Sequence, residues 1–146
     1  MRYKRLFLEN AYVFLTVVTS KRRPILIDNI ALLKESHIFL LPSIKAADGN
    51  EEGIPNALKE AMAMGLPVIA TFHAGNTELI EDGISGYLVL QKDVAALTQK
   101  MMYLIEHPEE WKSLSVNARK TVEERFEINK NIEKLEALFY QLLETS

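Results

Sequence analysis

The chain has 146 residues and a mass of 16.6 kDa, a common size for one domain. Its 48% hydrophobic and 25% charged residues are ordinary for a globular protein and exclude wholesale disorder. It has no cysteine, and its three histidines lie far apart in the sequence. These features exclude a disulfide framework, a cysteine nucleophile and a short metal-ligand motif.

The net charge of −3 is unevenly distributed along the chain. Residues 1–24 carry six basic side chains and one acidic side chain, a local charge of +5, so the remaining residues carry −8. Such asymmetry is typical of a basic arm that binds nucleic acid or a membrane surface. It is also typical of a chain joined from two pieces of different origin.

No segment predicts a membrane span or a cleaved leader. The uncharged run at residues 11–20 is far shorter than the ~20 apolar residues that cross a bilayer. The basic start before an apolar run is a feature of signal peptides, but Glu9 and Asn10 interrupt the run and no cleavage site of small residues follows. We therefore predict a cytoplasmic protein, either free or peripheral to the inner face of the membrane.

The first predicted elements are two strands separated by a short helix. Residues 12–19 are β-branched and aromatic, which favours a strand that ends before Pro24. Asp28 or Asn29 then suits the cap of a short helix. Residues 37–41 form a continuous apolar run that ends at Pro42, the pattern of a strand buried on both faces. The polar residues 44–53 predict a loop.

Helices and strands alternate after this loop. Pro55 suits the first position of a helix that ends at Gly65. Residues 68–71 and 86–90 predict buried strands, with a short helical turn over residues 78–80 between them. This alternation indicates a parallel sheet with right-handed crossovers. The predicted fold class is therefore α/β, a partial Rossmann-like parallel sheet with flanking helices.

Three helices complete the chain, the second beginning at Pro108 and the third at about Asn129. In each of them apolar side chains recur at spacings of three and four residues, which predicts one apolar face. These side chains are Val94, Leu97, Met101 and Leu104 in the first helix, Trp111, Leu114, Ala118 and Val122 in the second, and Ile132, Leu135, Leu138 and Leu142 in the third.

The segment from Gly53 to Asn56 is the strongest candidate for a binding site. It lies between the carboxyl end of a predicted parallel strand and the start of a helix, where ligands of open α/β sheets bind. The amides of Gly53, Ile54 and Asn56 would face a bound anion, which the helix dipole also favours. Gly53 permits close approach of the backbone, and Pro55 fixes the first helical turn.

Two carboxylates would border the same cleft. Glu52 lies in the loop, and Glu60 lies in the second turn of the helix. A carboxylate beside a bound nucleotide accepts hydrogen bonds from two ribose hydroxyls, and a second one can accept from a sugar hydroxyl. Two further polar residues follow strand ends. Ser43 could bind the donor ligand and His73 could contact a phosphate, but we interpret Ser43 as a turn-forming serine and His73 as a partly exposed loop histidine.

Two long motifs carry a resemblance to a known family. Residues 52–71 read Glu-Gly-Ile-Pro-Asn-Ala-Leu-Lys-Glu-Ala-Met-Ala-Met-Gly-Leu-Pro-Val-Ile-Ala-Thr, and residues 78–89 read Glu-Leu-Ile-Glu-Asp-Gly-Ile-Ser-Gly-Tyr-Leu-Val. From about His37 to its end, the chain resembles the C-terminal half of the donor domain of retaining glycosyltransferase family 4, which has the GT-B fold. The members it resembles most act in exopolysaccharide and colanic-acid synthesis.

This resemblance implies a function and a set of site residues. The family transfers a hexose from a nucleotide diphosphosugar with retention, without a metal ion or other cofactor, and the expected acceptor is lipid-linked or an oligosaccharide. The sequence departs from the family pattern at Asn76 and Thr77, where relatives often have a hydrophobic residue and a proline. The implied residues are Glu52 as the catalytic residue at the donor sugar, Gly53, Ile54, Pro55 and Asn56 at the sugar and phosphates, and Glu60 at the ribose.

The resemblance also implies that parts of the family fold are missing. That fold has two facing domains and well over twice this length. The acceptor domain and the first strands of the donor domain, which bring an Arg/Lys pair to the diphosphate, have no counterpart here. We therefore predict that the chain is incomplete as an enzyme. The sheet edge left open is a candidate surface for a homo-oligomer, and residues 12–19 have the character to cover it.

Residues 1–36 are similar to the start of REP-associated tyrosine transposases, through the runs at residues 3–5, 12–19, 22–26 and 29–33. The His-x-His metal motif of that family is absent, so its nuclease chemistry is not implied and nucleic acid is not an expected partner. We predict a fusion of a transposase-like segment (1–36) with a glycosyltransferase domain fragment (37–146). Two alternatives stay open: a noncatalytic nucleotide-sugar-binding module, and a DNA-binding remnant.

Overall fold

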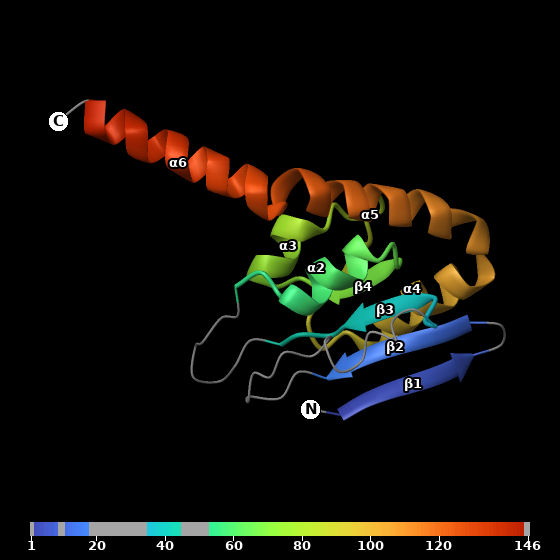
Figure 1. Cartoon of the computed structure of the whole chain (residues 1–146). Coiled ribbons are helices and arrows are strands. Elements are labelled where there is room, and N and C mark those ends of the chain that lie inside the picture. The colour runs from blue at the N-terminus through green and yellow to red at the C-terminus, as the bar shows by residue number, and fades with distance from the viewer. Residues whose placement is uncertain (1, 9–10, 18–34, 45–52, 145–146) are drawn as a thin grey trace.

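A five-stranded sheet organises the protein (Figure 1). The computed structural model describes residues 2–8, 11–17, 35–44 and 53–144. The strands lie in the order β1 (Arg2–Leu8), β2 (Ala11–Val17), β3 (Ile38–Leu41), β4 (Val68–Thr71) and β5 (Tyr87–Val89). Strands β2 to β5 are mutually parallel, and β1 pairs antiparallel with β2. The predicted α/β class with a parallel sheet and flanking helices is confirmed.

The N-terminal hairpin covers one flank of β3. Phe14 of β2 pairs with Phe39 of β3, so a strand within residues 12–19 covers this edge as the sequence analysis expected, and the pairing is parallel. The strand β1 was not predicted. Its run Arg-Tyr-Lys-Arg-Leu-Phe-Leu is rich in basic residues, which natural proteins place on edge strands to prevent further pairing. The predicted helix near Asp28 lies outside the described residues.

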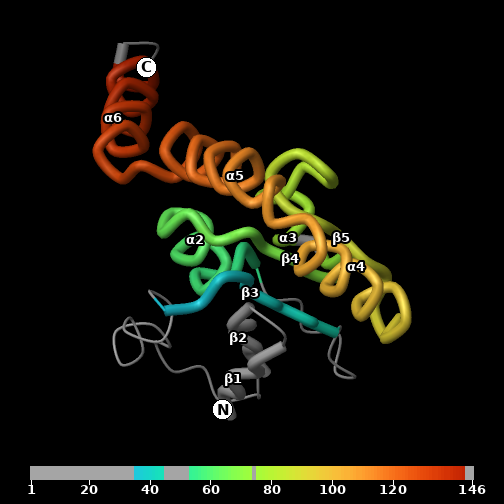
Figure 2. Tube along the Cα trace, turned by 90° about the vertical axis from the view of Figure 1, so that its right-hand side faces the viewer, coloured from blue at the N-terminus to red at the C-terminus, as the bar shows by residue number. Residues whose placement is uncertain are grey.

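The core lies on both faces of the sheet, because β3, β4 and β5 are buried along their whole length. Successive strand residues point to opposite faces. Phe39 and Val68 pack with α2 (Asn56–Ala63) and α5 (Trp111–Arg125) on one face. Ile38 and Ile69 pack with α4 (Val94–Glu106) and the start of α5 on the other. Figure 2 shows α5 lying along α2.

Local signals place most helix ends where the sequence predicts them. Helix α2 begins at Asn56, one residue after Pro55, which caps it in an extended conformation. It ends at Ala63, two residues before Gly65, whose φ of +76° allows the amide of Leu66 to reach the carbonyl of Ala61 at 3.1 Å. A short 3-10 turn, η1 (Pro108–Glu110), precedes α5. By contrast, α3 spans Ala74–Leu79 and begins earlier than the turn predicted over residues 78–80.

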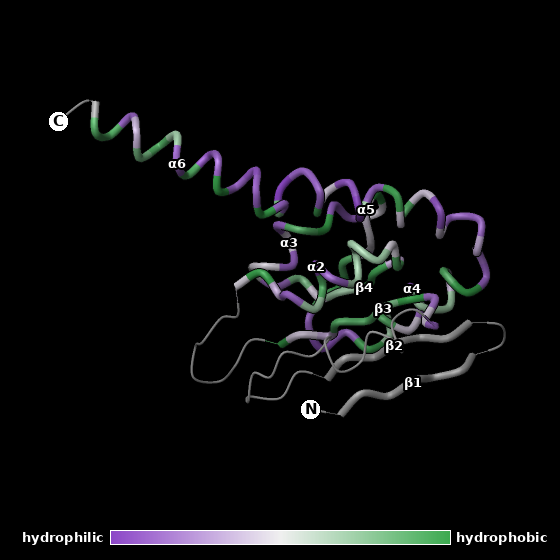
Figure 3. Tube along the Cα trace, viewed as in Figure 1, coloured by the Kyte–Doolittle hydropathy of each residue, from purple (hydrophilic) through white to green (hydrophobic). Residues whose placement is uncertain are grey.

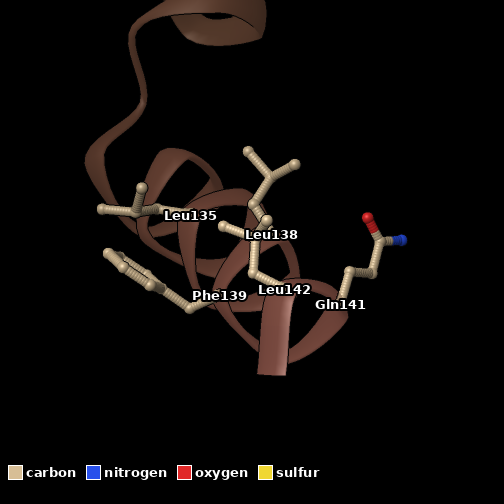
Figure 4. A pocket seen from close by; sticks show the side chains of 5 residues that line it. All are labelled: Leu135, Leu138, Phe139, Gln141 and Leu142. Carbon is tan, nitrogen blue, oxygen red and sulfur yellow. The ribbon is translucent and has the colours of Figure 1, made fainter. Parts of the chain in front are cut away.

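The last helix, α6 (Ile128–Glu144), extends away from the sheet (Figure 1). Its apolar side chains recur as predicted and appear as alternating colours along the tube in Figure 3. They are not buried, since Ile132, Leu135, Leu138 and Leu142 are 46% to 63% exposed. A pocket of about 390 Å³ lies on this face, lined by Leu135, Leu138, Phe139, Gln141 and Leu142 (Figure 4). No helix in the described part of the chain has the length and apolar content to cross a membrane.

Candidate functional site

The candidate site lies at the carboxyl edge of the parallel strands. Ser43 follows the end of β3, and His73 follows the end of β4. Helices α2 and α3 begin on the connections that leave these two strands. In open α/β sheets this edge is where ligands bind, because loops and helix N-termini converge there.

The start of α2 presents backbone donors without acceptors. The carbonyl of Pro55 accepts from the amides of Leu58 and Lys59, both at 3.2 Å. Among the described residues, the amides of Asn56 and Ala57 have no acceptor, and no side chain caps this helix. Free amides at the positive end of the helix dipole favour a bound anion.

The segment before α2 touches the start of α3. A Cβ built on Gly75 would lie 2.4 Å from the carbonyl oxygen of Gly53 and 2.6 Å from the Cα of Ile54. Only a glycine fits this approach, because real Cβ atoms do not come that close to backbone. Sequence reasoning gave Gly75 no role and did not find the contact. The contact holds both helix starts together at the sheet edge.

Glu60 lies on α2 at the position four residues after Asn56, so the two share one face of the helix. Its side chain is exposed and can accept hydrogen bonds from a ligand. Partial burial against the helix surface nevertheless raises the pKa of the Glu60 carboxyl above its ordinary value, and the positive charge of Lys59 opposes that rise.

The predicted site residues are placed to different extents. Gly53 and Asn56 are exposed, Ile54 is half-buried against the core, and Pro55 is buried. Gly53, Ile54 and Pro55 lead directly into α2, and Asn56 and Glu60 lie on it. Glu52 lies outside the described residues, so its catalytic role stays a prediction, as do the ligand contacts of the other five.

A polar edge, which we define as Ser43, Thr71, His73 and Asn76, joins the ends of β3 and β4 to α3. Thr71 Oγ1 donates to the carbonyl of Ser43 at 2.5 Å. Asn76 Nδ2 donates to the carbonyl of Thr71 at 2.9 Å. The amide of Asn76 donates to the carbonyl of His73 at 3.0 Å. These bonds fix the four residues as one unit beside the α2 start.

Three atoms of this polar edge are buried without a hydrogen-bond partner in the described part of the chain: Ser43 Oγ, His73 Nδ1 and Asn76 Oδ1. His73 is only 8% exposed, so its interpretation as a partly exposed loop residue is wrong. Helix α3 begins directly after it, so His73 is the N-cap of a helix and not a residue of an open loop. Buried polar atoms are normally satisfied, and an exception suggests a ligand, a water or a catalytic role.

We searched the described residues for side chains that could bind a metal ion. No group of three or more His, Asp or Glu side chains within residues 2–8, 11–17, 35–44 and 53–144 is arranged to hold a metal ion.

Comparison with known proteins identifies the family. Residues 21–121 match the family described as Glycosyl transferases group 1. The chain belongs to this family. The match begins within residues 1–36, and it does not address the transposase resemblance, so the boundary at residue 36 stays a prediction.

Several glycosyltransferases are similar in sequence to this group 1 glycosyltransferase domain. The putative colanic acid biosynthesis glycosyltransferase WcaL of Escherichia coli is 52% identical over 49% of this chain and 18% of its own length. The amylovoran biosynthesis glycosyltransferase AmsK of Erwinia amylovora is 47% identical over 64% of this chain and 23% of its own length. The matched residues thus span at most about a quarter of these relatives.

Solved glycosyltransferases share the fold of the domain. A glycosyltransferase of Rickettsia africae superposes with a TM-score of 0.71 at 30% identity, over 82% of this chain and 31% of its own. HepE of Anabaena in complex with UDP superposes with a TM-score of 0.68 at 23% identity, over 75% of this chain and 29% of its own. The protein therefore has part of a GT-B fold, the architecture of glycosyltransferase enzymes.

Proposed function

We propose that this domain is the donor-binding part of a retaining glycosyltransferase that transfers a hexose from a nucleotide diphosphosugar. The observation that carries the proposal is the start of α2, where the amides of Asn56 and Ala57 lack acceptors at the carboxyl edge of the sheet. The family match and the UDP and UDP-glucose complexes of HepE support a nucleotide sugar as the ligand.

Each predicted residue has a role in this proposal. The α2 amides hold the diphosphate, and Glu60, one helical turn further on, accepts from the ribose hydroxyls. Glu52 acts at the donor sugar, and Gly53, Ile54 and Pro55 approach the sugar and its phosphates through their backbone. Because amides and the helix dipole meet the phosphate charge, we propose that the donor binds without a metal ion, so that EDTA leaves its affinity unchanged.

We propose that transfer needs more than these 146 residues. Holding donor and acceptor in reacting geometry contributes about 7–11 kcal/mol to catalysis. A helix N-terminus contributes only about 0.3–2 kcal/mol to the stabilisation of an anion. The polypeptide on its own is therefore expected to bind the donor without transferring it. In the complete enzyme the proposed acceptor is lipid-linked or an oligosaccharide.

The test is calorimetric titration of the purified chain with UDP and with UDP-glucose. Loss of a hydrogen bond to a charged group costs about 1–3 kcal/mol, so Glu60→Gln should weaken both ligands roughly fivefold to a hundredfold. Glu106→Gln, at the far end of α4, removes the same charge and should change neither affinity. Failure of the parent chain to bind UDP would contradict the proposal, and equal binding by Glu60→Gln would remove the ribose role.

A further inference from the structure

Three polar side-chain atoms of the polar edge have no hydrogen-bond partner among the described residues. The function proposed above gives these atoms no role. Asn76 is fully buried and His73 is 92% buried, since 0% and 8% of their surfaces are exposed. Ser43 Oγ, His73 Nδ1 and Asn76 Oδ1 have no partner among the described residues. Three such atoms at one edge of a small domain are unusual, because folded proteins satisfy nearly all buried polar groups.

Backbone and side-chain hydrogen bonds link the residues that carry these atoms, and two of these bonds are made by Thr71. Thr71 binds Ser43 through its hydroxyl and Asn76 through its carbonyl, at 2.5 and 2.9 Å. His73 binds the amide of Asn76 through its own carbonyl. Because these bonds use the carbonyl of Ser43 and the Nδ2 of Asn76, they fix both residues and leave Ser43 Oγ and Asn76 Oδ1 unused. The hydrogen bonds thus hold these residues in place and leave Ser43 Oγ and Asn76 Oδ1 without a partner among the described residues.

The polar edge adjoins the proposed donor site. Asn76 follows Gly75, whose Cα lies so close to Gly53 that a Cβ there would meet the carbonyl of Gly53 at 2.4 Å. Gly53 in turn lies three residues before the first free amide of α2, that of Asn56. The polar edge is therefore next to the segment that leads into the α2 start.

The donor and acceptor capacity of the three atoms indicates which ligand group can pair with them. Asn76 Oδ1 is a carbonyl oxygen and only accepts, and the bond from Asn76 Nδ2 to Thr71 fixes which side-chain atom is the oxygen. Ser43 Oγ donates and accepts, and His73 Nδ1 does either, depending on the tautomer. A phosphate oxygen only accepts and would leave Asn76 Oδ1 unpaired. A hydroxyl group both donates and accepts, so its chemistry suits each of the three atoms.

We propose that the polar edge is the subsite for the hydroxyl groups of the donor hexose. Asn76 Oδ1 accepts from one sugar hydroxyl, and Ser43 Oγ and His73 Nδ1 complete the hydrogen bonds of that hydroxyl or its neighbour. This inference rests on the proposed function and assigns it a sugar-reading residue, Asn76, at a position where the sequence departs from the family pattern. A site built on such bonds discriminates against sugars that lack the matching hydroxyl.

The experiment compares the affinities of the full chain for UDP and UDP-glucose, with their ratio as the readout. The parent should bind UDP-glucose more tightly than UDP. Ser43→Ala removes only the free hydroxyl and keeps the carbonyl that Thr71 binds. It should lower the ratio threefold to tenfold, the effect of one neutral hydrogen bond, and leave the affinity for UDP unchanged. Asn76→Leu should act in the same way.

A matched control and the contrary outcomes make the test decisive. Thr98→Ala removes an exposed hydroxyl from α4 and should leave the ratio unchanged. If Asn76→Leu does not fold, as judged by thermal unfolding, Ser43→Ala decides alone. An unchanged ratio in the folded variants means that the three atoms bind a buried water instead, and it overturns this inference. If the parent still binds UDP in that case, the proposed function is upheld. A parent chain that binds neither ligand overturns both.

Discussion

The contact between Gly75 and Gly53 predicts a specific effect of adding one methyl group. In Gly75→Ala the new Cβ would lie 2.4 Å from the carbonyl oxygen of Gly53 and 2.6 Å from the Cα of Ile54. Since ordinary contacts begin near 3.5 Å, the two segments must separate by roughly 1 Å. Both neighbouring atoms belong to backbone, so no side chain can rotate away. Overpacking of this kind costs about 1–3 kcal/mol, and the better helix propensity of alanine returns up to about 1 kcal/mol.

We therefore expect Gly75→Ala to lower the free energy of unfolding by about 1–2 kcal/mol and to weaken UDP binding, because the displaced segment leads into α2. Urea denaturation and calorimetry measure the two effects. Gly53→Ala is the control for stability, since nothing lies within 4 Å of a Cβ at that position. If Gly75→Ala keeps the parent's stability and UDP affinity, the two helix starts are not held by this contact and the reasoning is wrong.

Two further predictions concern stability and the sheet edge. Burial, a hydrogen bond of 3.0 Å to Glu110 and the negative charge of that carboxylate raise the pKa of Tyr87 to about 12, against about 10 in an unfolded chain. The unfolded state therefore loses this proton first, and the free energy of unfolding should fall between pH 10 and 12. Tyr87→Phe should flatten that fall in urea titrations, and an equally steep fall in the variant would exclude Tyr87 as its cause. Deletion of residues 1–36 removes β2 and exposes the flank of β3, so size-exclusion chromatography should show oligomers or aggregates. A soluble monomer of equal stability would refute this protective role for the N-terminal hairpin.

The sequence predicted those parts of the fold that local chemistry determines. Residues 38–41 and 68–70 are apolar throughout, and such continuous runs are typical of strands covered on both faces. Pro55 and Gly65 mark the two ends of α2 because one restricts φ and the other adopts a positive φ. The segment that begins at Gly53 was located in the same way, from the position of a glycine and a proline between a strand and a helix.

The features that sequence reasoning missed depend on residues far apart in the chain. The clash that requires Gly75 involves Gly53, 22 positions earlier, and no local pattern reports it. The place of His73 as the N-cap of α3 was missed because the apolar residues that suggested a helix come later than Ala74, where α3 begins. The strand β1 is held by pairing with β2, and its own charged sequence does not indicate a strand.

Helix α6 shows what an amphipathic pattern establishes and what it does not. Spacings of three and four residues predict a helix with one apolar face, and the structure has that helix at residues 128–144. The pattern does not say which surface covers the face, and within the described residues the side chains of Leu135 and Leu142 remain 54% and 63% exposed. Isolated helices shorter than about 12–15 residues are marginal in water, and α6, with 17 residues, is only slightly longer. The proposed donor site therefore lies among elements that pack on the sheet, whereas the apolar face of α6 is left exposed by the described residues.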